Sequence, residues 1–297
     1  MSRDQATTLG PTAIGAAPPG GRPLAMVRAL GAIGLLGAGA VGAVLRPRPG
    51  SRPLTRSVVR QASWMLAAGL PLVGLVHVAL GSFLAMQAYY GATFVIATGP
   101  VVGLGLLRNL SPLVAGWVLA ALLAVRTAPE LRDPTRPGLD EEPGWAPDRD
   151  VARGLVADPR PPADPARLAA ARVLAAMLAG PVLGLLGALV GLGVGIGVSG
   201  AMLGLPAPIF LDKFLEMFWA RDVFGLAAKG VAFGGGSALL ACSQGLRDRG
   251  EGDSWALSFR VACLSVAAIL AMNMAWFLLA YHAGPPWGPT VLRPPSL

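Results

Sequence analysis

The chain has 297 residues, of which 54% are hydrophobic and only 13% charged, and its formal net charge is +8. An average soluble domain carries about 25% charged residues, so the composition excludes a disordered chain and opposes an ordinary soluble domain. With only Cys242 and Cys263, it also excludes a disulfide scaffold, and we expect both to be buried thiols because they lie in apolar segments. The 40 glycines suit helices that pack closely in lipid, which makes a polytopic α-helical membrane protein the leading class.

Five segments are long and apolar enough to cross a bilayer, which takes roughly 20 residues. In chain order they are 62–87, 92–128, 168–200, 223–246 and 257–281. The second is interrupted by Arg108-Asn109-Leu110-Ser111-Pro112, and the proline predicts a bend there.

The segments outside the predicted spans differ in character. Residues 1–22 form a tail without periodicity, and 23–60 hold an apolar, Gly-rich run at 24–45 followed by a basic linker. Residues 206–219 alternate apolar and charged groups with helical spacing, which predicts a short amphipathic helix on the outer face. The loop 129–167 is too rich in proline for a long helix, and 285–297 form a second tail. The membrane-spanning domain would therefore extend over 61–284.

The distribution of arginine predicts the orientation of the spans. Nineteen of the 24 basic residues lie in four segments, 1–28, 46–60, 126–172 and 247–260. By the positive-inside rule these segments are cytoplasmic. The four segments can all lie on the same side of the membrane only if the run 24–45 does not cross it, which leaves five crossings. We therefore interpret this run as an interfacial helix on the cytoplasmic leaflet. The N-terminus is then cytoplasmic and the C-terminal tail external.

Sequence motifs for catalysis, metal or nucleotide binding are not found. There is no GxxxxGK[ST] loop to bind ATP, and the glycines at 191–197 lie in an apolar span with no strand before them. His77 and His282 are far apart and have no partner with metal-ligand spacing. We interpret His77 as a hydrogen-bonded interior histidine rather than a proton relay. The sequence thus predicts no cofactor or metal in this chain, and no enzyme.

Polar residues inside the predicted spans are the candidate site, because charges in lipid face a protein interior or water. Three are charged and four are neutral: Arg108, Asp222, Lys229, Gln87, Asn109, Gln244 and Asn273. Arg108 and Asn109 either belong to an inter-helix hydrogen-bond cluster that fixes the packing, or Arg108 lines a path for an anionic headgroup. We expect Asp222 to cap the start of its span and Lys229 to extend toward the outer end.

Several stretches of the chain together resemble the MlaE/YrbE family of permeases. The first is LLRNLSPLVAGWVLAALLAVRTAPEL at 106–131, and the second is ADPARLAAARVLAAM at 163–177. The third, RDVFGLAAKGVAFGGGSALLACSQGL at 221–246, is similar to the family's D…G..K…FG…..C..G signature. The fourth is GEGDSWALSFRVACLSVAAILAMN at 250–273, and Gly81 and Gln87 fit the family's first span.

The resemblance implies the membrane subunit of an ABC-type lipid transporter that works with MCE proteins. Partners would be a second permease chain, an ATPase subunit that binds ATP, and the MCE proteins; nucleic acid is not expected. Substrate-path candidates are Gln87, Arg108, Asn109 and Pro112, and candidates for ATPase coupling are Glu130, Asp164 and Arg172. The location would be the inner or plasma membrane, and the substrate a phospholipid, other hydrophobic lipid or sterol-like molecule.

The chain departs from the family pattern at three places. Asn109 stands where the family has a glutamate, and Leu122 where it has an arginine. After Leu131 the family's coupling helix is replaced by a longer, Pro-rich segment. An alternative is therefore a degenerate, non-transporting scaffold that pairs with an active permease chain. A third hypothesis, an unrelated membrane enzyme or ion-coupled carrier, would need clustered acids or histidines in the spans.

Overall fold

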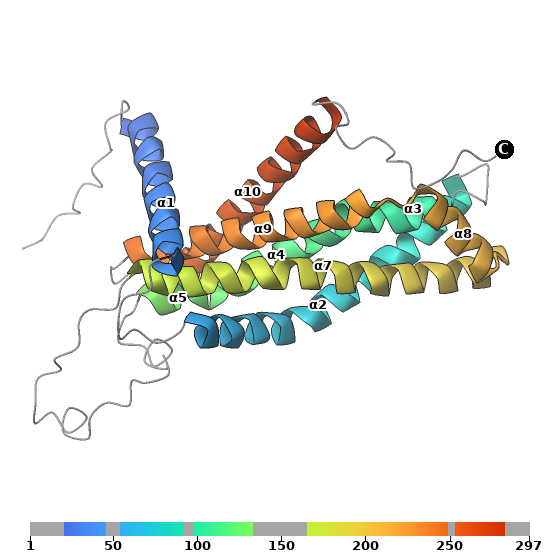
Figure 1. Cartoon of the computed structure of the whole chain (residues 1–297), viewed down its shortest axis with the longest axis horizontal. Coiled ribbons are helices and arrows are strands. Elements are labelled where there is room, and N and C mark those ends of the chain that lie inside the picture. Colours follow the sequence, from blue (N-terminus) through green and yellow to red (C-terminus); the bar gives the residue numbers. More distant parts are fainter. Residues whose placement is uncertain (1–20, 46–53, 92–97, 133–164, 249–252, 283–297) are drawn as a thin grey trace, which may run out of the picture.

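The computed structural model describes residues 21–45, 54–91, 98–132, 165–248 and 253–282 (Figure 1). This part of the chain is almost entirely helical and contains no strand. The elements are α1 (Gly21–Leu45), α2 (Leu54–Gly91), α3 (Thr98–Gly105), the π-helical segment η2 (Leu106–Leu110), α4 (Ser111–Val125), α5 (Thr127–Arg132), α7 (Pro165–Leu203), α8 (Ala207–Met217), α9 (Ala220–Arg247) and α10 (Ser254–His282).

Among the described residues, five helical stretches are long and apolar enough to cross a membrane: Leu54–Ala88, Thr98–Arg132, Ala166–Leu203, Ala220–Arg247 and Ser254–Leu279. They correspond one to one with the five predicted spans, and the all-α polytopic fold class is confirmed. The second stretch joins α3, η2, α4 and α5 into one interrupted rod.

The first span begins earlier than its apolar residues indicate. α2 starts at Leu54, so residues 54–60, predicted as basic linker, are helical. No proline or glycine occurs between Pro53 and Gly69 to stop the helix there. Arg56 is exposed on this added turn, so the helix carries its charge beyond the apolar segment.

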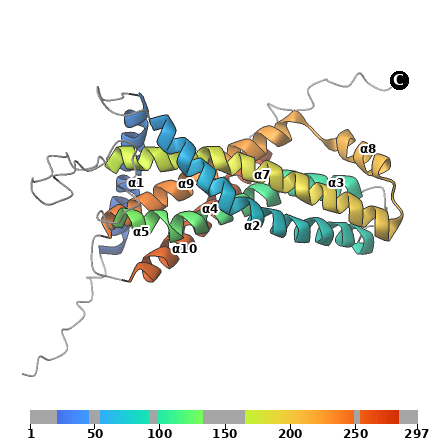
Figure 2. The same cartoon turned by 90° about the horizontal axis from the view of Figure 1, so that it is seen from below.

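The long helices α7 and α9 run along the long axis of the molecule, and α7 packs between α2 and α9 (Figures 1 and 2). α10 packs on α4 and α9 and diverges from them toward its C-terminal end. The predicted amphipathic helix at 206–219 is present as α8, which buries Phe210 and Phe214 and lies beside α3 at one end of the bundle.

α1 runs across the long axis at the opposite end, near α5 (Figure 1). It contacts the ends of α7 and α9, and the Arg247 side chain donates to the carbonyl of Arg28 at 3.2 Å. Much of its other surface is apolar and exposed, including Leu35 and Leu45. This placement is compatible with the predicted interfacial helix, which stays a prediction.

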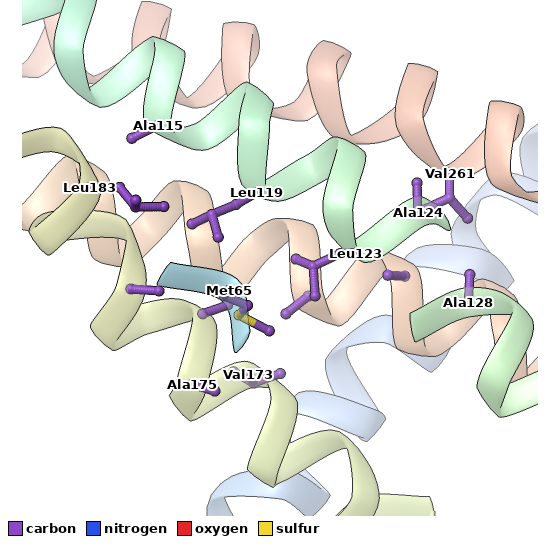
Figure 3. Close-up of a cluster of buried hydrophobic side chains, with 14 of the residues drawn as sticks. Met65, Ala115, Leu119, Leu123, Ala124, Ala128, Val173, Ala175, Leu183 and Val261 are labelled. Atoms are coloured by element: carbon purple, nitrogen blue, oxygen red, sulfur yellow. The ribbon is translucent and has the colours of Figure 1, made fainter. Parts of the chain in front are cut away.

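The main core lies where α2, α4, α7, α9 and α10 meet (Figure 3). Four side chains are fully buried there: Met65, Leu119, Leu123 and Leu183. Each lies on the face of its helix where buried positions recur every three or four residues. Many other apolar side chains of the same helices are exposed, notably on α2 and α10, as expected for surfaces that face lipid.

One prediction about the cysteines is wrong. Both thiols are free, and Cys242 is buried as expected, but Cys263 is exposed. Cys263 lies on α10, where positions 257, 261, 265 and 269 face the bundle and leave position 263 on the outward side. An apolar segment alone therefore does not tell whether a thiol faces protein or the outer surface.

Glycines let α7 and α9 approach to backbone contact. A Cβ added at Gly180 would fall against the carbonyl of Gly230, and one at Gly234 against the carbonyl of Ala176. Small residues at a helix crossing allow this approach in membrane proteins. By contrast, a Cβ at Gly193, also on α7, would meet nothing within 4 Å.

Gly180→Ala is therefore expected to destabilise the chain by about 1–3 kcal/mol, because the added methyl group forces the two backbones apart. The measurement is the free energy of unfolding in mixed micelles. Gly193→Ala is the matched control and should change it by less than about 0.5 kcal/mol. Equal effects of the two substitutions would show that the crossing is not as tight as described.

Candidate functional site

A proline interrupts the regular α-helix of the second span. Pro112 has no N–H, so it cannot donate to the carbonyl of Arg108 four residues earlier. Just before it, η2 has π-helical hydrogen bonding, and the Ser111 N–H donates to the carbonyl of Leu106. The predicted bend is thus a π-helical segment immediately before Ser111-Pro112, an irregularity often found at functional sites.

Arg108 forms the ion pair that joins this segment to α9. Its Nε donates to Asp222 Oδ1 at 2.8 Å and its second terminal nitrogen to Asp222 Oδ2 at 3.0 Å. The same nitrogen also donates to the carbonyl of Met217, the last residue of α8, at 3.2 Å. The Arg108 side chain is 41% exposed, while that of Asp222 is only 5% exposed.

Asp222 has a second function, which the sequence predicted. Its Oδ2 accepts from the Trp219 N–H at 3.0 Å, so it caps the first turn of α9. Arg108 and Asp222 together fix the turn between α8 and α9 against η2.

The prediction that Lys229 extends toward the outer end is wrong. Lys229 is 3% exposed, and its Nζ donates to the carbonyl of Arg108 at 2.9 Å. The ammonium group also lies 4.7 Å from the centroid of the Phe277 ring and 5.8 Å from that of Trp276. A carbonyl acceptor and two ring faces thus keep it inside the bundle.

α10 completes the cluster. The Asn273 Nδ2 donates to Asn109 Oδ1 at 3.3 Å, while Asn273 Oδ1 is buried and has no partner among the described residues. We call Arg108, Asn109, Asp222, Lys229 and Asn273 the break cluster. It joins η2, α9 and α10, so the inter-helix hydrogen bonds predicted from the sequence are present. The headgroup-path interpretation rests on the exposed part of Arg108 and stays a prediction.

Two other candidates lie elsewhere. Gln87 is exposed near the C-terminal end of α2, and Gln244 lies near the C-terminal end of α9, where its carbonyl accepts from the Asp248 N–H. The structure gives neither side chain a hydrogen bond to the break cluster. Pro112 is buried and shapes the cluster through the backbone.

His77 is an interior residue with both ring nitrogens engaged. Nδ1 lies 2.7 Å from the Val73 carbonyl and Nε2 lies 2.8 Å from Ser111 Oγ. The ring packs against Gly187 of α7, where a Cβ would lie 2.5 Å from Cε1. His77 therefore connects α2 to the start of α4, as predicted for a hydrogen-bonded interior histidine.

A second ionic group lies at the end of the bundle near α1. Glu130, in α5, accepts from Arg126 Nε at 2.7 Å and from the second terminal nitrogen of Arg172 at 3.3 Å. Its side chain is 12% exposed and that of Arg172 only 4%. The guanidinium of Arg126 lies 4.3 Å from the centroid of the Trp64 ring. We call these four residues the Glu130 cluster; it ties α2, α5 and α7 together.

Two members of this cluster were missed by sequence reasoning. Arg126 could have been found, because it precedes Glu130 by four residues, the spacing of a helical ion pair. It also lies one turn after Leu122, the position where the resemblance has an arginine. Trp64 gives no such signal, since its contact depends on how α2 crosses α4. Asp164 lies outside the described residues.

The fold defines a polytopic, all-α membrane protein in which three of the five described spans meet at a charged, hydrogen-bonded helix break. The family model Permease MlaE matches residues 163–279, the part that forms α7 to α10 up to Leu279. This match to the C-terminal part of the chain supports the resemblance to the MlaE/YrbE permease family. Members of this family are membrane transporter components, and the match suggests a permease subunit of a lipid ABC transporter. A search of curated proteins finds no match to the chain.

Arg108→Gln and Asp222→Asn are expected to be non-additive. Each single change leaves the other charge without its partner, whereas the double change removes both charges. A double-mutant cycle on the free energy of unfolding should give a coupling of about 1 kcal/mol, reduced from the value for a buried pair because Arg108 is partly exposed. Additive effects would mean that the ion pair does not join η2 to α9.

Glu130→Gln should destabilise the chain by about 2–4 kcal/mol, because it leaves the buried Arg172 without a counter-charge. Unfolding in mixed micelles measures this. Glu216→Gln is the control: Glu216 pairs with Lys213 at 2.9 Å on exposed α8, and its loss should cost at most about 1 kcal/mol. A Glu130→Gln variant as stable as the control would contradict a buried pair.

Proposed function

We propose that the chain is the permease subunit of an ABC-type lipid transporter that works with MCE proteins and a separate ATPase, and that it moves hydrophobic or sterol-like lipids across or out of the membrane. The observation that carries the proposal is the Permease MlaE match over α7 to α10, since these helices supply Asp222, Lys229 and Asn273 of the break cluster. A second permease chain would complete the lipid cavity.

The break cluster supports a headgroup position at Arg108. Within the described part of the chain, its ionic members are Arg108, Lys229 and Asp222, so cations outnumber carboxylates. Arg108 has an exposed portion beside apolar helices, so an anionic headgroup could contact it while the acyl or sterol part lies on the apolar surface. Asn109 and the Pro112 break would set the shape of that path.

The Glu130 cluster supports an attachment for the motor subunit at the opposite end. It lies at the same end of the bundle as α1 (Figure 1), and Glu130, Arg126 and Arg172 belong to the segment 126–172 that the positive-inside rule assigns to the cytoplasm. Glu130 and Arg172 link α5 to α7, and force applied to the intervening loop, including Asp164, would reach both helices. The membrane would be the inner or plasma membrane, with the N-terminus cytoplasmic.

Lipid binding tests the first part. The detergent-purified chain is analysed by native mass spectrometry after incubation with an anionic phospholipid and with a neutral sterol. Arg108→Gln is expected to reduce retention of the anionic lipid about tenfold, as for the loss of a charge-assisted hydrogen bond, and to leave sterol retention unchanged. Lys213→Gln on exposed α8 is the control. Unchanged retention of both lipids would remove Arg108 from the path.

Co-purification tests the partners. A complex that contains an MCE protein and a nucleotide-binding subunit supports the proposal, and in it Arg172→Met, which breaks the Glu130 cluster, is expected to weaken recovery of the nucleotide-binding subunit. A clean complex with an MCE protein but without that subunit would favour the scaffold alternative. In that case replacing Arg108 and Glu130 by alanine should leave lipid uptake intact.

A further inference from the structure

Lys229 is a buried cation with no acidic partner among the described residues. It is 3% exposed and lies on α9, in a stretch apolar enough to span a membrane. The structure gives it no ion pair with a described residue, and Asp222, on the same helix, is already engaged by Arg108 and the Trp219 N–H. A buried charge without a counter-charge is costly, so the contact that it keeps indicates what it does.

That contact is with a carbonyl that loses its usual α-helical donor. The acceptor is the Arg108 carbonyl, 2.9 Å from Lys229 Nζ. Its usual donor would be the N–H of residue 112, which is a proline. A buried carbonyl without a donor is unfavourable in apolar surroundings. Lys229 thus supplies the hydrogen bond that Pro112 removes.

The aromatic residues of α10 explain how the charge is tolerated. The rings of Phe277 and Trp276 approach the ammonium group at 4.7 Å and 5.8 Å from their centroids. Ring faces stabilise a cation without accepting a conventional hydrogen bond. Within the described part of the chain, Lys229 has one hydrogen-bond acceptor, the Arg108 carbonyl.

We propose that Lys229 is a positioning residue for Arg108: it holds the backbone of η2 at the proline break so that the Arg108 guanidinium meets Asp222. Arg108 is then fixed at both ends, its carbonyl by Lys229 and its guanidinium by Asp222 and the Met217 carbonyl. The orientation of the Arg108 side chain affects lipid binding only if the proposed function holds. The positioning of Arg108 by Lys229 does not depend on lipid.

The test is the Arg108–Asp222 double-mutant cycle, repeated in the Lys229→Met background on the full chain in mixed micelles without added lipid. If Lys229 positions Arg108, the coupling between Arg108→Gln and Asp222→Asn falls at least twofold. If Lys229 acts only through its charge, the coupling rises, because Asp222 loses a competing nearby cation. An unchanged or larger coupling overturns the proposal.

Two further backgrounds keep the result interpretable. Lys229→Arg retains a donor and should restore at least half of the lost coupling, and Lys213→Met, which changes the chain's only other lysine, should leave the coupling unaltered. If Lys229→Met does not fold, Lys229→Gln replaces it: its shorter side chain should lower the coupling, and an equal or larger value counts against positioning. This cycle contains no lipid, so an unchanged coupling in Lys229→Met would overturn the positioning role without testing the proposed function. Unchanged lipid retention in Arg108→Gln would count against the proposed function without testing the role of Lys229.

Discussion

One missing hydrogen-bond donor organises the centre of this protein. Pro112 stands inside a stretch that is apolar enough to cross the bilayer, where every backbone polar group needs a protein partner. Just before Pro112 the chain forms a π-helical segment, and Lys229 from α9 donates to the Arg108 carbonyl. Two helices, α9 and α10, therefore contact the interrupted segment η2, and the charged residues of these apolar spans interact with its backbone and with one another.

The two polar clusters differ in what they connect. The break cluster joins η2 to α9 and α10, whereas the Glu130 cluster joins α2, α5 and α7. Both include residues of the second span, which also contributes Leu119 and Leu123 to the main core. Motion of that span relative to α7 or α9 would have to break ion pairs at one end or the other. The clusters thus restrict how the bundle can rearrange.

Most of the fold could be predicted from the sequence, because span length and apolar composition are local properties. The five spans and α8 follow from such patterns, and Asp222 as a cap follows from its position at the start of α9. Contacts between distant segments could not be predicted in the same way. Lys229 was expected to extend outward because nothing in its own helix shows that the Arg108 carbonyl, 121 residues away, loses its usual donor to Pro112. Similarly, Trp64 reaches Arg126 only through the crossing of α2 over α4.

The length of α7 has a mechanical consequence. Its 39 residues make a helix of about 58 Å, nearly twice the roughly 30 Å of hydrocarbon in a bilayer. It is in backbone contact with α9 at Gly180, beside Pro181, and the part of α7 after that point is about half again as long as the part before it. If α7 pivoted about that contact, a small swing of the end that carries Arg172 would become a larger, opposite swing of the far end, beside α8.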